Sequence, residues 1–152
     1  MKHPIRNVLS LLCILIASAA EAQNQTGAKP SLFNNYPAAI NCAEQQISSV
    51  FNAAVDQNVS LSFSDNFTFS GKVISNVVKY NNLQTATIQS STFGDAIFVV
   101  SKLLNADRST SYIGRIINKK YFDGYELRKD ASNNYQLIKI ETDKVIEDCS
   151  HK

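Results

Sequence analysis

The chain has 152 residues, of which 44% are hydrophobic and 18% are charged. This composition is typical of a globular protein and argues against an intrinsically disordered one. The formal net charge of +2 is too small to predict binding to nucleic acid or to an anionic membrane surface.

Met1–Ala22 has the features of a secretory signal peptide. A charged start precedes the apolar run Val8–Ala17, and Ala20-Glu21-Ala22 supplies the small residues that signal peptidase accepts. The run is shorter than the roughly 20 apolar residues that a membrane-spanning helix needs. We therefore expect a secreted or periplasmic protein that begins at Gln23 and has no transmembrane segment after cleavage. Its net charge falls to +1, because the leader carries two cations and one acid.

Cys42 and Cys149 are the two cysteines that remain once the leader is removed. In an exported protein, two thiols most simply form one disulfide. The bridge would close a loop of roughly 100 residues, for which the chain-entropy model gives about 4.7 kcal/mol of stabilisation. Two free thiols and bridges between chains are the alternatives.

The first part of the mature chain predicts a flexible segment followed by a helix. Gln23–Asn35 is polar and without periodicity, which is typical of a flexible N-terminus. Pro37 then suits a first helical turn, and apolar residues recur at spacings of three and four. The apolar stripe of this expected amphipathic helix comprises Ile40, Ala43, Ile47, Val50, Phe51, Ala54 and Val55.

From Val59 onward the period of the apolar residues changes to two, which indicates half-buried strands. A bend or bulge is expected at Gly71, and a last helical turn over 143–148. Short turns separate the strands, which predicts an antiparallel meander of about six or seven strands. The expected fold is one α+β domain, residues 36–152, with the N-terminal helix packed on the sheet. The expected strands are 59–64, 67–80, 83–90, 96–101, 110–117, 125–128 and 135–140.

The supply of histidines limits the chemistry that is open to the chain. His3 belongs to the leader, and His151 is the penultimate residue. The mature chain therefore has no suitable histidine for a catalytic triad or a histidine zinc site, and the predicted disulfide would use both thiols. Common protease, esterase, β-lactamase and nucleotide-binding motifs are absent. No cofactor or metal is expected.

Carboxylate chemistry needs only two acids in a cleft. Asp123 and Glu126 are the nearest candidates, flanking Gly124-Tyr125. The favoured interpretation is a hairpin whose acids are solvated and pair with nearby cations. The alternative is a small carboxylate-dependent hydrolase of the cell envelope.

Residues 112–125 form the most suggestive surface stretch, because cations there alternate with aromatic rings. Tyrosine and arginine dominate binding hot spots in protein interfaces. The ordinary alternative is that Tyr112, Ile116 and Tyr125 belong to the core or to cross-strand pairs.

Within this stretch, the loop 118–124 is the expected contact site. Two adjacent rings cannot both point into one sheet face, so either Tyr121 or Phe122 should be exposed beside Lys119-Lys120. The candidate binding residues are Arg115, Lys119, Lys120, Tyr121, Phe122, Asp123 and Tyr125.

The sequence therefore predicts an exported, non-catalytic binding domain whose partner is a protein or a small extracellular ligand. The hydrolase alternative requires a cleft with two convergent acids. A ligand carrier is a further alternative, and it requires an apolar cavity between helix and sheet.

Overall fold

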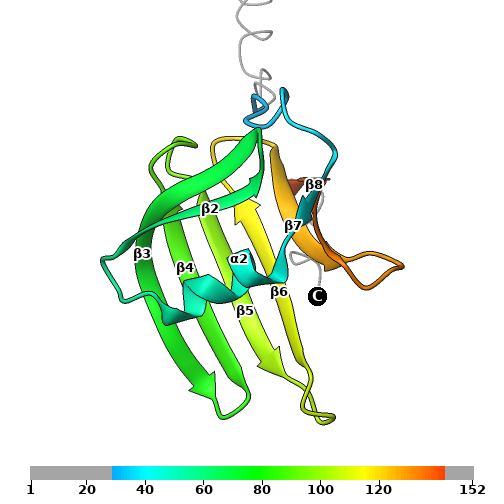
Figure 1. Cartoon of the computed structure of the whole chain (residues 1–152). Coiled ribbons are helices and arrows are strands. Elements are labelled where there is room, and N and C mark those ends of the chain that lie inside the picture. The colour runs from blue at the N-terminus through cyan, green and yellow to red at the C-terminus, as the bar shows by residue number, and fades with distance from the viewer. Residues whose placement is uncertain (1–28, 143–152) are drawn as a thin grey trace, which may run out of the picture.

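The computed structural model describes residues 29–142, which form one antiparallel sheet of eight strands (Figure 1). The strand order is β1-β8-β7-β6-β5-β4-β3-β2, and the sheet curls into a nearly closed barrel. Consecutive strands from β2 to β8 are neighbours, and the expected antiparallel sheet is confirmed. The elements are β1 (Ala39–Cys42), α2 (Glu44–Ser49), η2 (Val50–Asn52), β2 (Asn58–Ser64), β3 (Phe67–Tyr80), β4 (Leu83–Ser90), β5 (Ile97–Leu104), β6 (Thr110–Ile117), β7 (Asp123–Lys129) and β8 (Tyr135–Glu141).

The predicted α+β class and its N-terminal helix on a sheet of six or seven strands are wrong. The start of the expected helix is the strand β1, in which Ile40 and Cys42 are buried while Ala39 and Asn41 are exposed. This alternation has period two, and β1 pairs with β8 along its length. In the part of the chain that the structure describes, the helical elements are α2 and η2, which together cover nine residues, 44–52. None of the helices within residues 29–142 has the length and apolar character to cross a membrane.

The short helical segment α2–η2 lies across β4, β5 and β6 on the inner face of the sheet (Figure 1). Ile47, Val50 and Phe51 are its buried residues. Two polar side chains of the sheet hold its C-terminal end: Asn76 Nδ2 donates to Ala53 O at 2.8 Å, and Gln84 Nε2 donates to Phe51 O at 3.2 Å. These bonds satisfy carbonyl groups that a helix end leaves without partners.

The long strand β3 runs without a break through Gly71, which the sequence marked as a bend or bulge. Gly71 pairs regularly with Val59 on one side and Ser90 on the other. A Cβ atom there would lie 2.2 Å from Gln89 O, so the close approach of β4 requires glycine. The ladder shifts in register instead at 73/75 and 78/80 on β3 and at 62/64 on β2.

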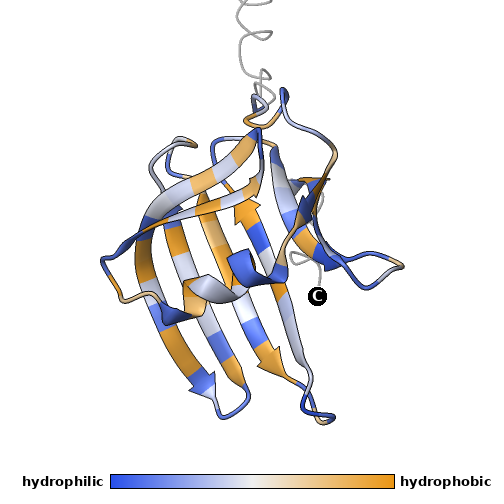
Figure 2. Cartoon of the chain, in the orientation of Figure 1, coloured by the Kyte–Doolittle hydropathy of each residue, from blue (hydrophilic) through white to orange (hydrophobic). Residues whose placement is uncertain are grey.

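Aromatic rings fill one end of the barrel interior. Hydrophobic and hydrophilic bands alternate along the strands (Figure 2), as expected for strands with one face in the core. Phe33, Phe67, Phe93 and Tyr125 pack against one another with ring centroids 5.1–6.0 Å apart. Phe33 is fully buried, so the packed part of the chain extends N-terminal to Tyr36.

Candidate functional site

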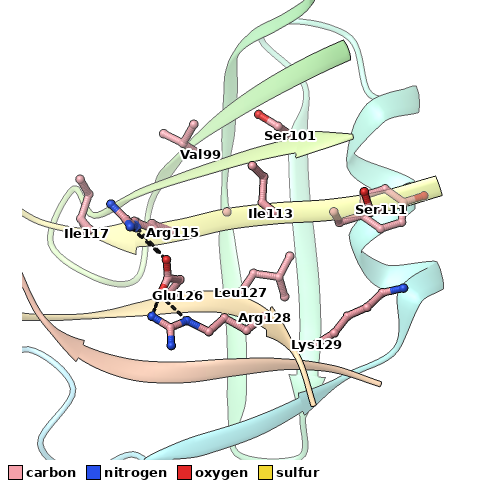
Figure 3. A pocket seen from close by; sticks show the side chains of 12 residues that line it. Val99, Ser101, Ser111, Ile113, Arg115, Ile117, Glu126, Leu127, Arg128 and Lys129 are labelled. Carbon is pink, nitrogen blue, oxygen red and sulfur yellow. Dashed lines mark hydrogen bonds and ion pairs between the residues drawn. The ribbon is translucent and has the colours of Figure 1, made fainter. Parts of the chain in front are cut away.

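A hollow lies on the outer face of the sheet, over β5, β6 and β7 (Figure 3). It has a volume of about 670 Å³. We call it the outer groove. Its main side chains are Val99, Ile113, Arg115, Glu126, Arg128 and Lys129.

Three charged side chains form an ion network in the outer groove. Arg115 donates from its guanidinium to Glu126 Oε1, with an N···O distance of 3.0 Å, and Arg128 binds Glu126 Oε2. Figure 3 shows the carboxylate between the two guanidinium groups. Burial alone would raise the pKa of Glu126, but the hydrogen bonds from Arg115 and Arg128 outweigh it and hold that pKa below its ordinary value. Two cations share one carboxylate, so the network has a net positive charge.

Two apolar side chains of the outer groove are exposed to solvent. Ile113 is 63% exposed and Val99 is 37% exposed. The residues on either side of Val99 in the sequence, Phe98 and Val100, face the other way and are fully buried. β5 therefore has apolar side chains on both faces, a pattern typical of strands that are covered on both sides.

The structure separates the seven predicted binding residues. Arg115 is in the outer groove, and it also lines a smaller adjoining hollow of about 270 Å³ with Lys119. Lys120 is exposed in the turn before β7. Tyr121 is half-buried, while Phe122 is 37% exposed and lines a different hollow, beside Ser31 and Lys139.

Asp123 and Tyr125 point into the barrel and hold the N-terminal segment in place. Asp123 is 2% exposed, and its carboxylate accepts hydrogen bonds from Leu32 N at 2.6 Å, from Phe33 N at 2.9 Å and from Ser31 Oγ. Tyr125 is fully buried and donates its hydroxyl to Pro37 O at 2.6 Å. On the neighbouring strand β8, Lys139 Nζ donates to Phe33 O and Tyr36 O. We call residues 31–37 the N-terminal strap.

The two carboxylates considered for hydrolysis, Asp123 and Glu126, do not converge. They are three residues apart on one strand, which places their side chains on opposite faces of the sheet. Asp123 binds the N-terminal strap inside, and Glu126 binds two arginines outside. Within residues 29–142, no three His, Cys, Asp or Glu side chains lie together as a metal site requires.

Stability is expected to fall at alkaline pH because Tyr125 must be protonated in the folded state. Burial, with the nearby Asp123 charge, raises its pKa from 10.0 to about 12. The unfolded chain therefore releases this proton at lower pH than the folded chain, and stability that is complete below pH 10 is lost as the pH rises towards 12. Thermal unfolding followed by circular dichroism from pH 8 to 11.5 should show this decline, and Tyr125→Phe should decline less steeply. Parallel curves for the two proteins would contradict this role.

Cys42 lies on the inner face of β1, 6% exposed, and its thiol donates to Ile40 O at 3.4 Å. Burial raises the pKa of this thiol from 9.0 to about 12, which makes the reduced form a poor nucleophile. Cys149, its predicted partner, lies outside the described residues, as does the helical turn expected over 143–148. The disulfide stays a prediction.

Comparison of the chain with protein-family models, with curated proteins and with solved structures found no match.

Several residues of the outer groove escaped the sequence analysis, among them Val99, Ile113 and Arg128. One signal could have found them. In residues 97–104 and 110–117, apolar residues occupy both sets of alternate positions, whereas a strand with one wet face needs only one set. Arg115 falls in the same outward set as Ile113 and Ile117.

Proposed function

We propose that the chain is an exported, non-catalytic binding protein and that its partner occupies the outer groove. The observation that carries the proposal is the presence of apolar side chains on both faces of β5 and β6. The inner set is packed in the core, but Ile113 and Val99 on the outer face are exposed. A partner that covers them would remove apolar surface from water, which is the main favourable term in association.

The contents of the barrel support an external site rather than an internal one. Phe67, Phe69 and Phe98 are fully buried in the interior, where Phe69 packs against Phe98 and Phe67 packs against other aromatic rings. Side chains thus occupy the space that a carrier would use for its ligand. Arg115 and Arg128 stand at the margin of the outer groove with side chains 48% and 61% exposed, and arginine is enriched in protein interfaces.

A photo-crosslinking residue at position 113 tests the proposed binding face. Position 78 is a matched control, because Val78 is 65% exposed against 63% for Ile113 and lies on β3, outside the groove. In cultures of the producing organism, we expect a specific crosslinked product from position 113 and none from position 78. Ile113→Glu should remove copurification of that product, while Val78→Glu should not. Equal crosslinking from both positions would contradict the proposed site.

Export and the disulfide are also part of this proposal, and one mass measurement tests both. The secreted product should begin at Gln23, and a non-reducing peptide map should link Cys42 to Cys149. Residues 142 to 149 span at most about 25 Å when fully extended. Cys42 pairs with Tyr135, at the other end of β8 from Thr142, so the link requires this segment to run back along the barrel. Alkylation of both cysteines in freshly isolated, unreduced protein would contradict the disulfide.

A further inference from the structure

The ladder between β6 and β7 ends early, and the outer groove lies where it ends. β6 pairs with β5 along its whole length, from Thr110 to Ile117. It pairs with β7 only at Gly114, Arg115 and Ile116. Within the described part of the chain, the stretch 110–113 therefore has a strand neighbour on one side alone.

In the gap where β6 and β7 no longer pair, a side chain instead of a strand accepts a hydrogen bond from the backbone of β6. The backbone N–H of Tyr112 donates to the hydroxyl of Tyr135, which reaches across from β8, at 3.0 Å. On the other side of the gap, Lys129 continues β7 and pairs with Tyr135 of β8, but no β6 residue is paired with it. The backbone edges of β6 and β7 both border the outer groove here, because residues 111–115 and 126–129 line it.

The charges of the groove select an acidic occupant. Among residues 29–142, Glu126 is the only acid that lines it, and Arg115 and Arg128 both bind it. Lys129 also borders the groove, but its Nζ lies over the ring of the buried Tyr135, 5.0 Å from the ring centroid, so the positive charge of the outer face comes from the two arginines. A second carboxylate in the groove would let each guanidinium have its own partner, and charge-assisted hydrogen bonds of this kind are stronger than neutral ones.

We infer that the occupant of the outer groove is an extended, acidic segment of a partner protein, which adds as a strand beside residues 110–113 of β6. This inference rests on the proposed function. Such a segment would complement three features of the outer groove. No β7 residue pairs with the stretch 110–113 of β6, where Tyr112 N–H is held by the Tyr135 hydroxyl, so an added strand would pair with the remaining backbone groups and displace that hydroxyl. Ile113 and Val99 would pack against an apolar side chain of the segment, and the arginines would bind a carboxylate. A strand with alternating apolar and acidic residues supplies all three, as in other cases of β-strand addition.

A random octapeptide library displayed on phage tests the inference. It is selected in parallel against the wild-type protein, Arg128→Glu and Ile113→Glu, each first shown by circular dichroism to be folded. We expect the wild-type selection to enrich peptides that combine Asp or Glu with Val or Ile. The synthetic form of an enriched peptide should bind Arg128→Glu at least about tenfold more weakly, equivalent to about 1.4 kcal/mol.

Two N-methylated forms of that peptide separate strand addition from simple charge attraction. One form carries methyl groups on the odd backbone nitrogens and the other on the even ones. In a strand, alternate N–H groups point to opposite sides, so only one form should lose binding to β6. Equal binding of both forms, no acidic bias among the enriched peptides, or no enrichment over Ile113→Glu would each overturn the inference.

The remaining outcomes distinguish other occupants of the groove. If sedimentation shows a dimer that Ile113→Glu abolishes, the occupant is a second copy of the chain and the inference is wrong. If position 113 crosslinks to a partner while no peptide is enriched, the proposed function stands and strand addition is overturned.

Discussion

Replacement of Asp123 with alanine is expected to lower the free energy of unfolding by about 3–5 kcal/mol. The carboxylate is 2% exposed and accepts hydrogen bonds from Leu32 N, Phe33 N and Ser31 Oγ. Alanine leaves these three donors without an acceptor in a place that water reaches poorly, and such groups are costly when buried. The N-terminal strap should then detach from the barrel and expose Phe33. Urea unfolding followed by far-ultraviolet circular dichroism would measure the change, since the chain has no tryptophan.

Two further variants show whether the effect belongs to this buried carboxylate. Asp123→Asn keeps one acceptor oxygen and should lose about half as much stability as alanine. Asp130→Ala is the matched control, because Asp130 Oδ1 accepts from Ser132 N and Asn134 N in an exposed turn. Water can replace that acceptor, so the loss should stay within about 1 kcal/mol. A similar loss for Asp123→Ala and Asp130→Ala would mean that Asp123 does not fasten the strap.

Most strands could be predicted from the sequence because their signal is local. In residues 59–64, serines alternate with Val59, Leu61 and Phe63, and the structure has β2 over Asn58–Ser64. Alternation or a compact apolar run, as in residues 96–101, with Asn, Asp and Gly in the turns, indicated the strands from β3 to β8. Pairing of consecutive strands then follows, because short turns join antiparallel neighbours.

The helix was overestimated because two periods coincide in the residues around Ile40. Ile40, Ala43 and Ile47 fit a helical stripe, but Ile40 and Cys42 also fit an alternating strand. The choice depends on β8, which lies about 95 residues away and offers a pairing edge to Ala39–Cys42. Such a contact is not visible in a local window. The same missing contact hid the eighth strand and the near closure of the barrel.

The candidate site was predicted only in part, because sequence proximity does not fix the face of a sheet. Residues 112–125 contain Arg115 of the outer groove, but Asp123 and Tyr125 from the same stretch point inward. Asp123 and Tyr125 occupy the same set of alternate strand positions as the buried Leu127, which indicates that they face inward. The early end of the β6–β7 ladder cannot be predicted from the sequence of either strand, because it depends on where the two strands diverge in space.

Phe67→Ala is expected to lower the free energy of unfolding by about 3–5 kcal/mol, the usual range for loss of a buried ring. Phe67 is fully buried, and its ring lies at the centre of a cluster of aromatic rings. Alanine would leave a cavity that this crowded set of rings cannot close without leaving its preferred tilted and edge-on arrangements. Its ring neighbours are Phe33, Tyr36, Phe63, Phe93 and Tyr125, with centroids 5.1–6.4 Å away.

Phe122→Ala provides the comparison, because it removes the same ring from a position that is 37% exposed. Its loss should be well below that of Phe67→Ala, and equal losses would contradict the assignment of Phe67 to the centre of the core. The double variant Asp123→Ala/Phe67→Ala adds a sharper test. Both substitutions loosen Phe33, one through its backbone and one through its ring. Each substitution already weakens contacts of Phe33 that the other would also weaken. The loss of unfolding free energy in the double variant should therefore be smaller than the sum of the two single losses by at least about 0.5 kcal/mol. Strict additivity would mean that the N-terminal strap and the aromatic core stabilise the barrel independently.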